Sequence, residues 1–403
     1  MRAVGIIVEY NPFHNGHLYQ LRQAKKDSNA DIVIVVMSAT FLQRGEPAFV
    51  SKWARTEMAL ANGADIVIEL PYAFSCQKAE QFANGAIQIL SEIAAHSIHF
   101  GSEAGNIAPF YELVEAIKRD QPTIDKYVKQ YIQKGVSYPR AFSNALQQVN
   151  QQTTLSLTEP NNILGYHYIK AIMEQNSVLK ASTTKRVQAH YHDKTIGLGR
   201  IASATSIRES IKKGMQIEDI AHTLPQSTAQ ILQSYFHLNK TYHTWNLYFP
   251  FLQYKIISST HEQLKQIYEC EEGLEYRLKE TIQHTYTFDD WMNQMKTKRY
   301  TRTRLQRLAS HILTNTTKEE MHQAYSEGLS YIQLLGFSAQ GQLYLKQTRK
   351  EREVPLLTKR ANAKGTISDL EKKASRIYTQ PLSKHAREKA IAQEFGAPIQ
   401  RRS

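Results

Sequence analysis

The feature that most constrains the fold is a set of short apolar runs in the first hundred residues, each followed by a helical pattern. The runs cover residues 3–8, 31–37 (DIVIVVM) and 64–70 (ADIVIEL), with a weaker fourth at 97–100. Near-continuous apolar strands separated by helices are typical of a parallel sheet covered on both faces. We therefore expect an α/β fold, with a doubly wound parallel sheet that binds ligands at the carboxyl ends of its strands.

The rest of the chain is expected to be mainly helical. Helical periodicity is found at residues 17–25, 52–61 and 79–94 and between about 107 and 176. One more strand is expected at 185–190, and small polar residues give way to a helix within 197–213. Beyond Pro225 the composition changes to helices rich in Gln, Tyr and Lys, without good strand pairs. We predict an N-terminal domain over residues 1–225 and a mainly α-helical region over 226–403, in which 359–373 looks loosely packed.

Charge narrows the choice of partners. The 403 residues contain 50 Lys and Arg against 37 Asp and Glu, a net charge of +13. Residues 341–403 alone hold fifteen Lys or Arg and six Asp or Glu, which accounts for +9 of that excess. Such a surplus attracts polyanions before specific contacts form. A partner with many phosphates should therefore meet the C-terminal part.

Other classes of protein are disfavoured by what the sequence lacks. Two cysteines, Cys76 and Cys270, cannot build a disulfide scaffold, and neither has zinc-ligand spacing. No run reaches the roughly 18 apolar residues of a membrane span, and the N-terminus lacks a secretory core. We expect a cytoplasmic protein without membrane contact, structural metal or obligate protein partner.

The loop after the first strand carries the strongest chemical signal. It includes His14-Asn15-Gly16-His17 at the start of a predicted helix. Glycine lets the backbone come close to a phosphate, free N–H groups at a helix N-terminus attract anions, and imidazoles can reach charge that develops there. The pattern indicates a triphosphate site. Metal binding by His14 and His17 is the alternative, which the lack of an obvious third ligand nearby disfavours.

A second motif reads Ala202-Ser203-Ala204-Thr205-Ser206-Ile207-Arg208. Ser203 can cap a helix, and Arg208, about one turn later, can lie along a phosphate. Taken alone this is an ordinary capped helix, but paired with HNGH it matches the two-part HxGH and ISSTxxR pattern. That pattern belongs to the nucleotidyltransferase superfamily that includes class I aminoacyl-tRNA synthetases. Ala202 and Ala204 depart from it, and this should matter little if Ser203, Thr205 and backbone N–H groups do the binding.

Longer strings extend the resemblance over essentially the whole chain. They are EYNPFHNGH at 9–17, QRGEPA at 43–48, NGADIVIELP at 62–71, FGSE at 100–103, PNNILG at 160–165, KTKRYTRTRL at 296–305 and LLGF at 334–337. Together they resemble the bacterial tRNA(Met) cytidine acetate ligase family. The resemblance implies that ATP and acetate form acetyl-adenylate with release of pyrophosphate. The acetyl group then passes to N4 of the wobble cytidine of elongator tRNA(Met).

The resemblance also implies site residues. It assigns to ATP the positions Ile7, Val8, Glu9, Tyr10, Asn11, Pro12, Phe13, His14, Asn15, Gly16, His17, Leu18, Tyr19 and Gln20, together with Gly101, Asn162 and Arg186. Ser203 joins them through the second motif. Attack by a carboxylate on the α-phosphate builds up charge that needs preplaced donors, for which His14, His17 and Arg208 are the candidates.

The acetate pocket and a metal site are not located by the sequence. Glu9, Glu69, Glu80 and Glu103 fall near the expected strand ends, where a carboxylate would repel acetate. We expect them to orient basic side chains or to hold the Mg²⁺ that accompanies ATP, and no metal ligand is named.

One basic segment is a candidate RNA contact. Residues 296–307 contain no Asp or Glu, and the candidates are Lys296, Lys298, Arg299, Tyr300, Arg302, Arg304 and Arg307. On a helix, Lys296, Arg299, Tyr300 and Arg307 would share about one face, where cations meet phosphates and the tyrosine stacks on a base. The usual alternative is a solvated charge run.

Two rival functions remain. The first is a nucleotidyltransferase that adenylylates a small phosphorylated metabolite, for which a basic second half would have no purpose. The second is a non-catalytic RNA-binding protein, which would not need an intact HNGH motif and Arg208.

Overall fold

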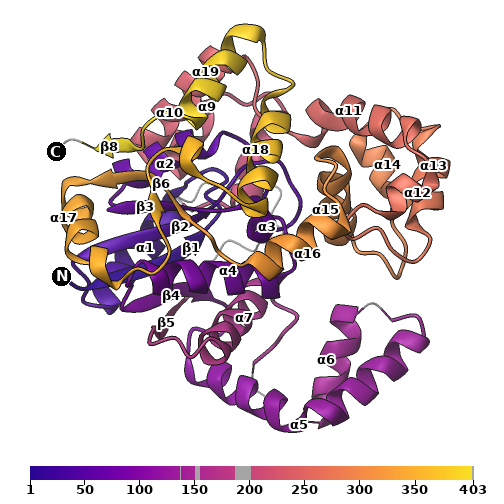
Figure 1. Cartoon of the computed structure of the whole chain (residues 1–403), viewed down its shortest axis with the longest axis horizontal. Helices are drawn as coiled ribbons and strands as arrows, with labels where there is room; N and C mark the ends of the chain where they lie inside the picture. The colour runs from indigo at the N-terminus through magenta and orange to yellow at the C-terminus, as the bar shows by residue number, and fades with distance from the viewer. Residues whose placement is uncertain (137, 150–154, 187–200, 402–403) are drawn as a thin grey trace.

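The structure is a computed structural model that describes residues 1–136, 138–149, 155–186 and 201–401. Eight strands of the described residues form one central sheet (Figure 1). The strands are β1 (Ala3–Val8), β2 (Ile32–Ser38), β3 (Ile66–Leu70), β4 (Ser97–Ser102), β5 (Lys180–Lys185), β6 (Ile332–Ser338), β7 (Leu356–Leu357) and β8 (Ile399–Arg401).

The order β5-β4-β1-β2-β3-β6-β7 places the first strand in the middle of the sheet, and β8 pairs with β6. All pairs are parallel except β3 with β6. β1, β2 and β3 are buried along their whole length, which explains their unbroken apolar character. Because the chain runs from β1 to β2 on one side and later returns to β4 on the other, the sheet has a switch point between β1 and β4.

Helices of the first half surround this sheet. They are α1 (Asn15–Asp27), α2 (Lys52–Ala61), α3 (Tyr72–Ser75), α4 (Ala79–Glu92), α5 (Ala108–Gln133), α6 (Tyr138–Val149), α7 (Pro160–Glu174), α8 (Ala204–Lys212) and α9 (Ile217–Ile220). The α5 and α6 helices extend away from the sheet at the lower edge of Figure 1. The expected doubly wound sheet with flanking helices is confirmed.

The second half is mainly helical, as expected. Its helices are α10 (Gln226–Asn239), α11 (Trp245–Ser258), α12 (His261–Lys265), α13 (Leu274–Ile282), α14 (Phe288–Met295), α15 (Arg302–Leu313), α16 (Lys318–Glu327), α17 (Ala339–Gln347), α18 (Thr366–Thr379) and α19 (Lys384–Glu394). The α11–α15 helices gather to one side of the sheet, whereas α10, α18 and α19 lie above it in Figure 1. None of the described helices is both long enough and apolar enough to cross a membrane.

Three expectations need correction. Beyond Pro225 we expected no good strand pairs, but β6 is a buried strand that pairs with β7 and β8 and joins the sheet by antiparallel pairing with β3. β5 covers Lys180–Lys185, so the strand expected at 185–190 begins five residues too late, and 187–190 lie outside the described residues. The segment 359–373 is well packed rather than loose, since Arg360 and Glu371 are buried. The division at residue 225 stays a prediction.

The well-packed segment belongs to a buried ionic network, defined by Lys52, Glu69, Arg360, Glu371 and Glu394. Lys52 Nζ lies 2.6 Å from Glu69, 3.1 Å from Glu371 and 2.7 Å from Glu394. Arg360 lies 2.5 Å from Glu69 and 3.2 Å from Glu394. The three carboxylates are close enough together to hold a metal ion, but Lys52 and Arg360 already form ion pairs with them. The network therefore joins β3 to α18 and α19 rather than forming a metal site.

Candidate active site at the switch point

A cavity of about 230 Å³ opens where β1 and β4 end, and we call it the switch-point pocket. Its lining comes from the β1–α1 loop, the loop 42–46, the end of β4, the start of α7 and the segment 201–208. The two sequence motifs, almost 200 residues apart, therefore meet at one site. The position agrees with the expectation that ligands of such sheets bind beyond the carboxyl ends of the strands.

His14 begins α1 as its N-cap residue. Its Nδ1 accepts a hydrogen bond from Gly16 N at 3.0 Å, and His17 Nδ1 accepts one from His14 N at 3.4 Å, which closes a capping box. With Nδ1 used as an acceptor, the neutral His14 ring carries its proton on Nε2. The ring centroids of His14 and His17 are only 3.8 Å apart. The helix cap thus fixes both imidazoles at the pocket.

Gly16 is required by the packing of His14. A Cβ at this position would lie 2.8 Å from His14 Cε1 and 3.0 Å from His14 Nδ1, closer than ordinary contacts allow. The glycine of HNGH therefore makes room for the histidine ring as well as for a ligand. This reason could not be read from the motif.

Both imidazoles are neutral at neutral pH. Burial and, after it, the charges of Arg186 and Arg208 lower the pKa of His14 to about 3. Burial and the neighbouring His14 and Arg186 hold the pKa of His17 well below 6.5. His14 can thus donate a hydrogen bond from Nε2 to a phosphate oxygen, whereas the His17 ring is hydrogen-bonded to the Pro12 carbonyl. The positive charge of the site comes from arginines.

Arg208 links the two motifs. Ser203 caps α8 by accepting a hydrogen bond from Ser206 N at 3.0 Å, and Arg208 lies one turn further along the helix. The guanidinium donates to the Asn11 carbonyl at 2.8 Å and forms an ion pair with Glu46 at 3.0 Å. The cation expected to meet phosphate is therefore held against the HNGH loop.

The β4 side of the pocket contains Gly101 and Arg186. A Cβ on Gly101 would lie 3.4 Å from Arg186 Cγ, at ordinary contact distance, so the packing of this arginine does not require glycine. Arg186 donates to Asn161 Oδ1 at 3.3 Å. Asn162, expected at ATP, does not line the pocket but accepts a hydrogen bond from Ala104 N at 3.1 Å and donates to Ser156 O at 3.1 Å. It acts on the pocket by holding the loop after β4.

Of the positions in 7–20 that we expected at ATP, some line the pocket and others lie behind the lining residues. Pro12, Phe13, Asn15 and Leu18 do not line the cavity, whereas the other residues of 7–20 that we expected there do. Phe13 packs against the His17 ring with centroids 5.8 Å apart. Other residues, to which sequence reasoning assigned no role, also line the cavity. They include Gln43, Arg44 and Glu46, which lie in the string QRGEPA, and Asn161, Phe100 and Tyr168. No local pattern in the sequence indicates that these residues face the pocket, because the fold brings them there from separate segments.

The four acidic residues near the strand ends all have protein partners. Glu9 accepts from Gln43 N at 2.9 Å, Glu103 from Asn162 N at 2.9 Å, Glu80 pairs with Lys170, and Glu69 belongs to the buried network. Burial raises the pKa of Glu9. Of the two roles expected for these residues, orienting basic side chains fits Glu80 and Glu69, whereas Glu9 and Glu103 accept hydrogen bonds from backbone amides. No Mg²⁺ ligand is assigned.

The basic segment folds differently from the expected single helix. Thr301 caps α15, which begins only at Arg302, so Lys296, Arg299 and Tyr300 do not share a helical face with Arg307. Acidic residues distant in sequence face the segment: Arg299 lies 2.9 Å from Glu272, Arg302 2.5 Å from Asp289, Arg304 3.7 Å from Glu272 and Arg307 3.0 Å from Glu269.

These contacts sort the candidate RNA residues. Arg307 and Tyr300 are buried, and Tyr300 lies beneath the Arg304 guanidinium, so the tyrosine does not present a free face for a base. Lys296 and Lys298 are exposed and form no ion pair within the part of the chain that the structure describes. RNA contact by the segment stays a prediction, best carried by the two lysines and then by Arg299 and Arg302, which are exposed but ion-paired.

The segment nevertheless adjoins the pocket. Gly45, in the loop that lines the cavity, lies against the backbone of Arg307, where a Cβ would approach within 2.2 Å. Its carbonyl accepts hydrogen bonds from Trp245 Nε1 at 3.1 Å and Ser310 Oγ at 2.9 Å. The α15 helix thus supports the loop that carries Arg44 and Glu46.

The fold and the paired motifs define an HxGH-type nucleotidyltransferase. The sequence profile of the HIGH nucleotidyl transferases matches residues 1–394, and the chain belongs to that class. Its relatives include the tRNA(Met) cytidine acetate ligases of a Geobacillus strain, 48% identical with 99% of both chains covered, and of Bacillus subtilis, 44% identical over 99% of this chain and 97% of the relative. The chain is a member of the tRNA(Met) cytidine acetate ligase family.

Solved structures agree with this assignment. The apo form of Thermotoga maritima TmcAL is 30% identical, with complete coverage of both chains and a TM-score of 0.93. The same protein bound to alpha-thio ATP gives a TM-score of 0.90 at the same identity and coverage.

Proposed function

We propose that this chain activates acetate with ATP as acetyl-adenylate and transfers the acetyl group to N4 of the wobble cytidine of elongator tRNA(Met). The observation that carries the proposal is the convergence of His14, His17 and Arg208 on one pocket at the switch point of the sheet. The family supports it, since the named relatives are tRNA(Met) cytidine acetate ligases and the Thermotoga maritima protein has been crystallised with an ATP analogue.

In the first step, an acetate oxygen attacks the α-phosphorus of ATP while the bond to the pyrophosphate oxygen breaks. The added charge spreads over the phosphate oxygens and the leaving group. His14 donates from Nε2 without a proton having to be lost, because its ring is neutral, and Arg208 and Arg186 supply positive charge. Preplaced donors of this kind lower the barrier because they need no reorganisation during the reaction.

In the second step, N4 of cytidine attacks the acetyl carbonyl carbon, the bond to the AMP oxygen breaks, and N4 loses a proton. The amine is a weak nucleophile, so holding it beside the mixed anhydride supplies much of the rate. We assign no residue as general base. Residues 1–225 would carry both steps, and the basic region 226–403 would hold the tRNA, with the 296–307 segment next to the pocket.

The proposal is tested by pyrophosphate release from ATP, with and without acetate and tRNA. Acetate should be required for release, and labelled acetyl should appear on tRNA(Met) as N4-acetylcytidine. Release that ignores acetate but depends on a phosphorylated metabolite would instead identify an adenylyltransferase. Binding of tRNA without any turnover would identify a non-catalytic RNA-binding protein.

A further inference from the structure

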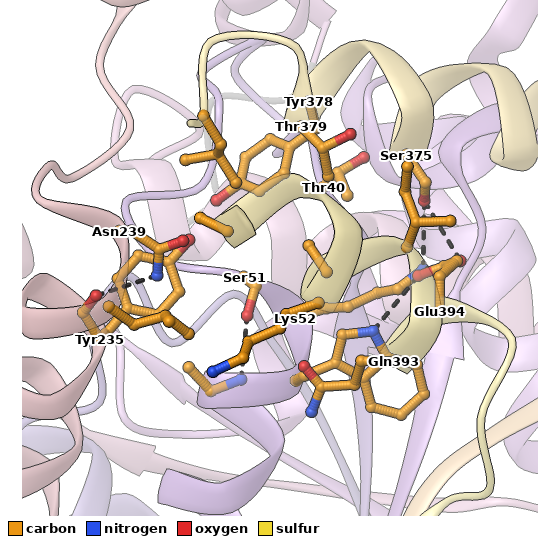
Figure 2. A pocket seen from close by; sticks show the side chains of 18 of the residues that line it. Thr40, Ser51, Lys52, Tyr235, Asn239, Ser375, Tyr378, Thr379, Gln393 and Glu394 are labelled. Carbon is orange, nitrogen blue, oxygen red and sulfur yellow. Dashed lines mark hydrogen bonds and ion pairs between the residues drawn. The ribbon is translucent and has the colours of Figure 1, made fainter. Parts of the chain in front are cut away.

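A second cavity, of about 450 Å³, lies between α2, α10, α18 and α19, and we call it the α10–α19 pocket (Figure 2). It shares no lining residue with the switch-point pocket. The ionic network lies at its inner wall, where Lys52, Ser375 and Glu394 already bond to one another, as the dashed lines in Figure 2 show in part. The open volume lies outside that network.

Apolar groups line the pocket although solvent reaches them. Leu238 of α10 is 38% exposed, and Ile391 and Phe395 at the end of α19 are 39% and 36% exposed. The half-buried Tyr235 ring adds further flat surface, and the buried Trp53 ring forms part of the wall. Exposed aromatic and aliphatic groups around a cavity favour a ligand with a flat apolar face.

Polar groups also form part of the pocket wall. Thr40 is 3% exposed, and its Oγ1, which forms no hydrogen bond with any described residue, is itself closed off from the open volume. The amides of Asn239 and Gln393 also belong to the lining, as Figure 2 shows.

The rim of the pocket is positive. Arg376 of α18 and Lys389 of α19 are exposed, and neither forms an ion pair within the described ranges. Lys372 also lines the cavity and reaches Asp369 at 3.5 Å. Of the two acidic lining residues, Glu394 is used by Lys52 and Arg360, which leaves Glu57 as the opposing charge. A ligand with at least one phosphate is therefore favoured.

A flat face, hydrogen-bonding edges and a phosphate together describe a nucleotide. We infer that the α10–α19 pocket binds an unpaired nucleotide of the RNA substrate, with its base among Leu238, Ile391 and Phe395 and its phosphates at Arg376 and Lys389. This inference rests on the proposed function. Single-stranded nucleotides are commonly held by stacking beside a cationic groove.

The connection between the two pockets supports an RNA rather than a free nucleotide. Thr40 lines the α10–α19 pocket, and Leu42, two residues later, lines the switch-point pocket. Their Cα atoms are separated by no more than about 7 Å of chain. Residues 40–42 thus form a wall common to the two pockets, and in our proposal one RNA loop occupies both.

The test compares variants for binding to elongator tRNA(Met). Phe395→Ala should weaken binding about tenfold, and Phe395→Tyr should restore it, because a stacking face returns. Arg376→Ala and Lys389→Ala should each weaken binding several-fold and reduce the salt dependence by about one counterion. Lys384→Ala, which removes an exposed lysine of α19 that does not line the cavity, is the matched control and should bind like the unaltered chain.

Several results would overturn the inference. If Phe395→Ala binds tRNA as tightly as the unaltered chain, no base enters the α10–α19 pocket, even if the charge variants bind less tightly. Saturable binding of AMP or CMP that Phe395→Ala abolishes, with tRNA binding intact, would assign the pocket to a free nucleotide. If the unaltered chain does not acetylate tRNA, the proposed function is contradicted. If it does acetylate tRNA but the variants bind like the control, only the assignment of the α10–α19 pocket is contradicted.

Discussion

The contact between Gly16 and the His14 ring shows how one missing side chain sets the chemistry of the site. Gly16 lies in the first turn of α1 with ordinary helical neighbours, and its hydrogen atom faces the imidazole. The ring is thereby held with Nδ1 on the Gly16 N–H and Nε2 free to donate. Backbone, cap and catalytic donor form one unit, so a methyl group at this position displaces the donor directly.

Gly16→Ala should lower acetate-dependent pyrophosphate release by at least about 100-fold, the loss seen when a preplaced donor is removed. The free energy of unfolding should change by no more than about 1 kcal/mol, because alanine is a better helix former than glycine. Kinetic assays and urea unfolding measure the two effects. Lys25→Ala, on an exposed position of the same helix, should change neither, and equal activity of the two variants would contradict this role of Gly16.

Among the elements, α15 has a role that its basic sequence conceals. Its middle, at Gln306, Arg307 and Ser310, supports the loop around Gly45, which has a positive φ of 76° and touches the Arg307 backbone. Ion pairs with residues 269–272 hold the helix in place from the other side. The position of Arg44 and Glu46 in the switch-point pocket therefore depends on a helix more than 250 residues away in the chain.

Gly45→Ala should destabilise the chain by at least about 2 kcal/mol, since a Cβ meets backbone and the left-handed conformation adds its own cost. Pyrophosphate release should fall with it. Gly214→Ala is the matched control, because Gly214 also has a positive φ, of 94°, but no atom lies within 4 Å of an added Cβ. Chemical denaturation of both variants gives the comparison, and equal losses would show that α15 does not support the loop.

How well sequence predicted these elements depends on where their partners lie. β1, β2 and β3 are buried on both faces and so carry an unbroken apolar signal, and the HNGH loop follows the first of them directly. β6 is equally buried, but it stands alone among helices and pairs with a strand from the other end of the chain. The acidic neighbours of α15 likewise come from other segments. Patterns within one segment were therefore sufficient to predict the HNGH loop and strands β1 to β3. They could not predict β6 or the contacts of α15, because those depend on distant segments.

Considered as one folded unit, the chain is joined across its length by the ionic network. Glu69 on β3 is paired with Lys52, 17 residues away, and with Arg360, 291 residues away. All five side chains are almost completely removed from solvent. Buried ion pairs contribute little compared with apolar packing, but losing one partner leaves charges without compensation.

Lys52→Met should therefore lower the free energy of unfolding by about 3–5 kcal/mol, since three buried carboxylates would then share Arg360 alone. Lys212→Met, which breaks the exposed pair with Glu209, should cost no more than about 1 kcal/mol. Urea unfolding at neutral pH measures both. A small effect at Lys52 would mean that the network does not join the two halves.

Buried neutral histidines should make stability depend on pH. Burial lowers the pKa of His243 to about 3 in the folded chain. As the pH falls, the unfolded chain therefore takes up this proton near pH 6.5, whereas the folded chain takes it up only near pH 3. Its contribution is complete above pH 6.5 and is lost as the pH falls toward 3. Replacing His243 with Gln should reduce the pH slope of the unfolding free energy between pH 6 and 4 by about 1 kcal/mol per pH unit. An unchanged slope would contradict the buried neutral form.

The most direct measurement is acetate-dependent pyrophosphate release, together with N4-acetylcytidine in tRNA(Met), for the unaltered chain and for His17→Ala. The unaltered chain should release pyrophosphate only when acetate is present and should acetylate the tRNA, whereas His17→Ala should lose both by at least about 100-fold. Undiminished release and acetylation by His17→Ala would contradict the assignment of the chemistry to the switch-point pocket.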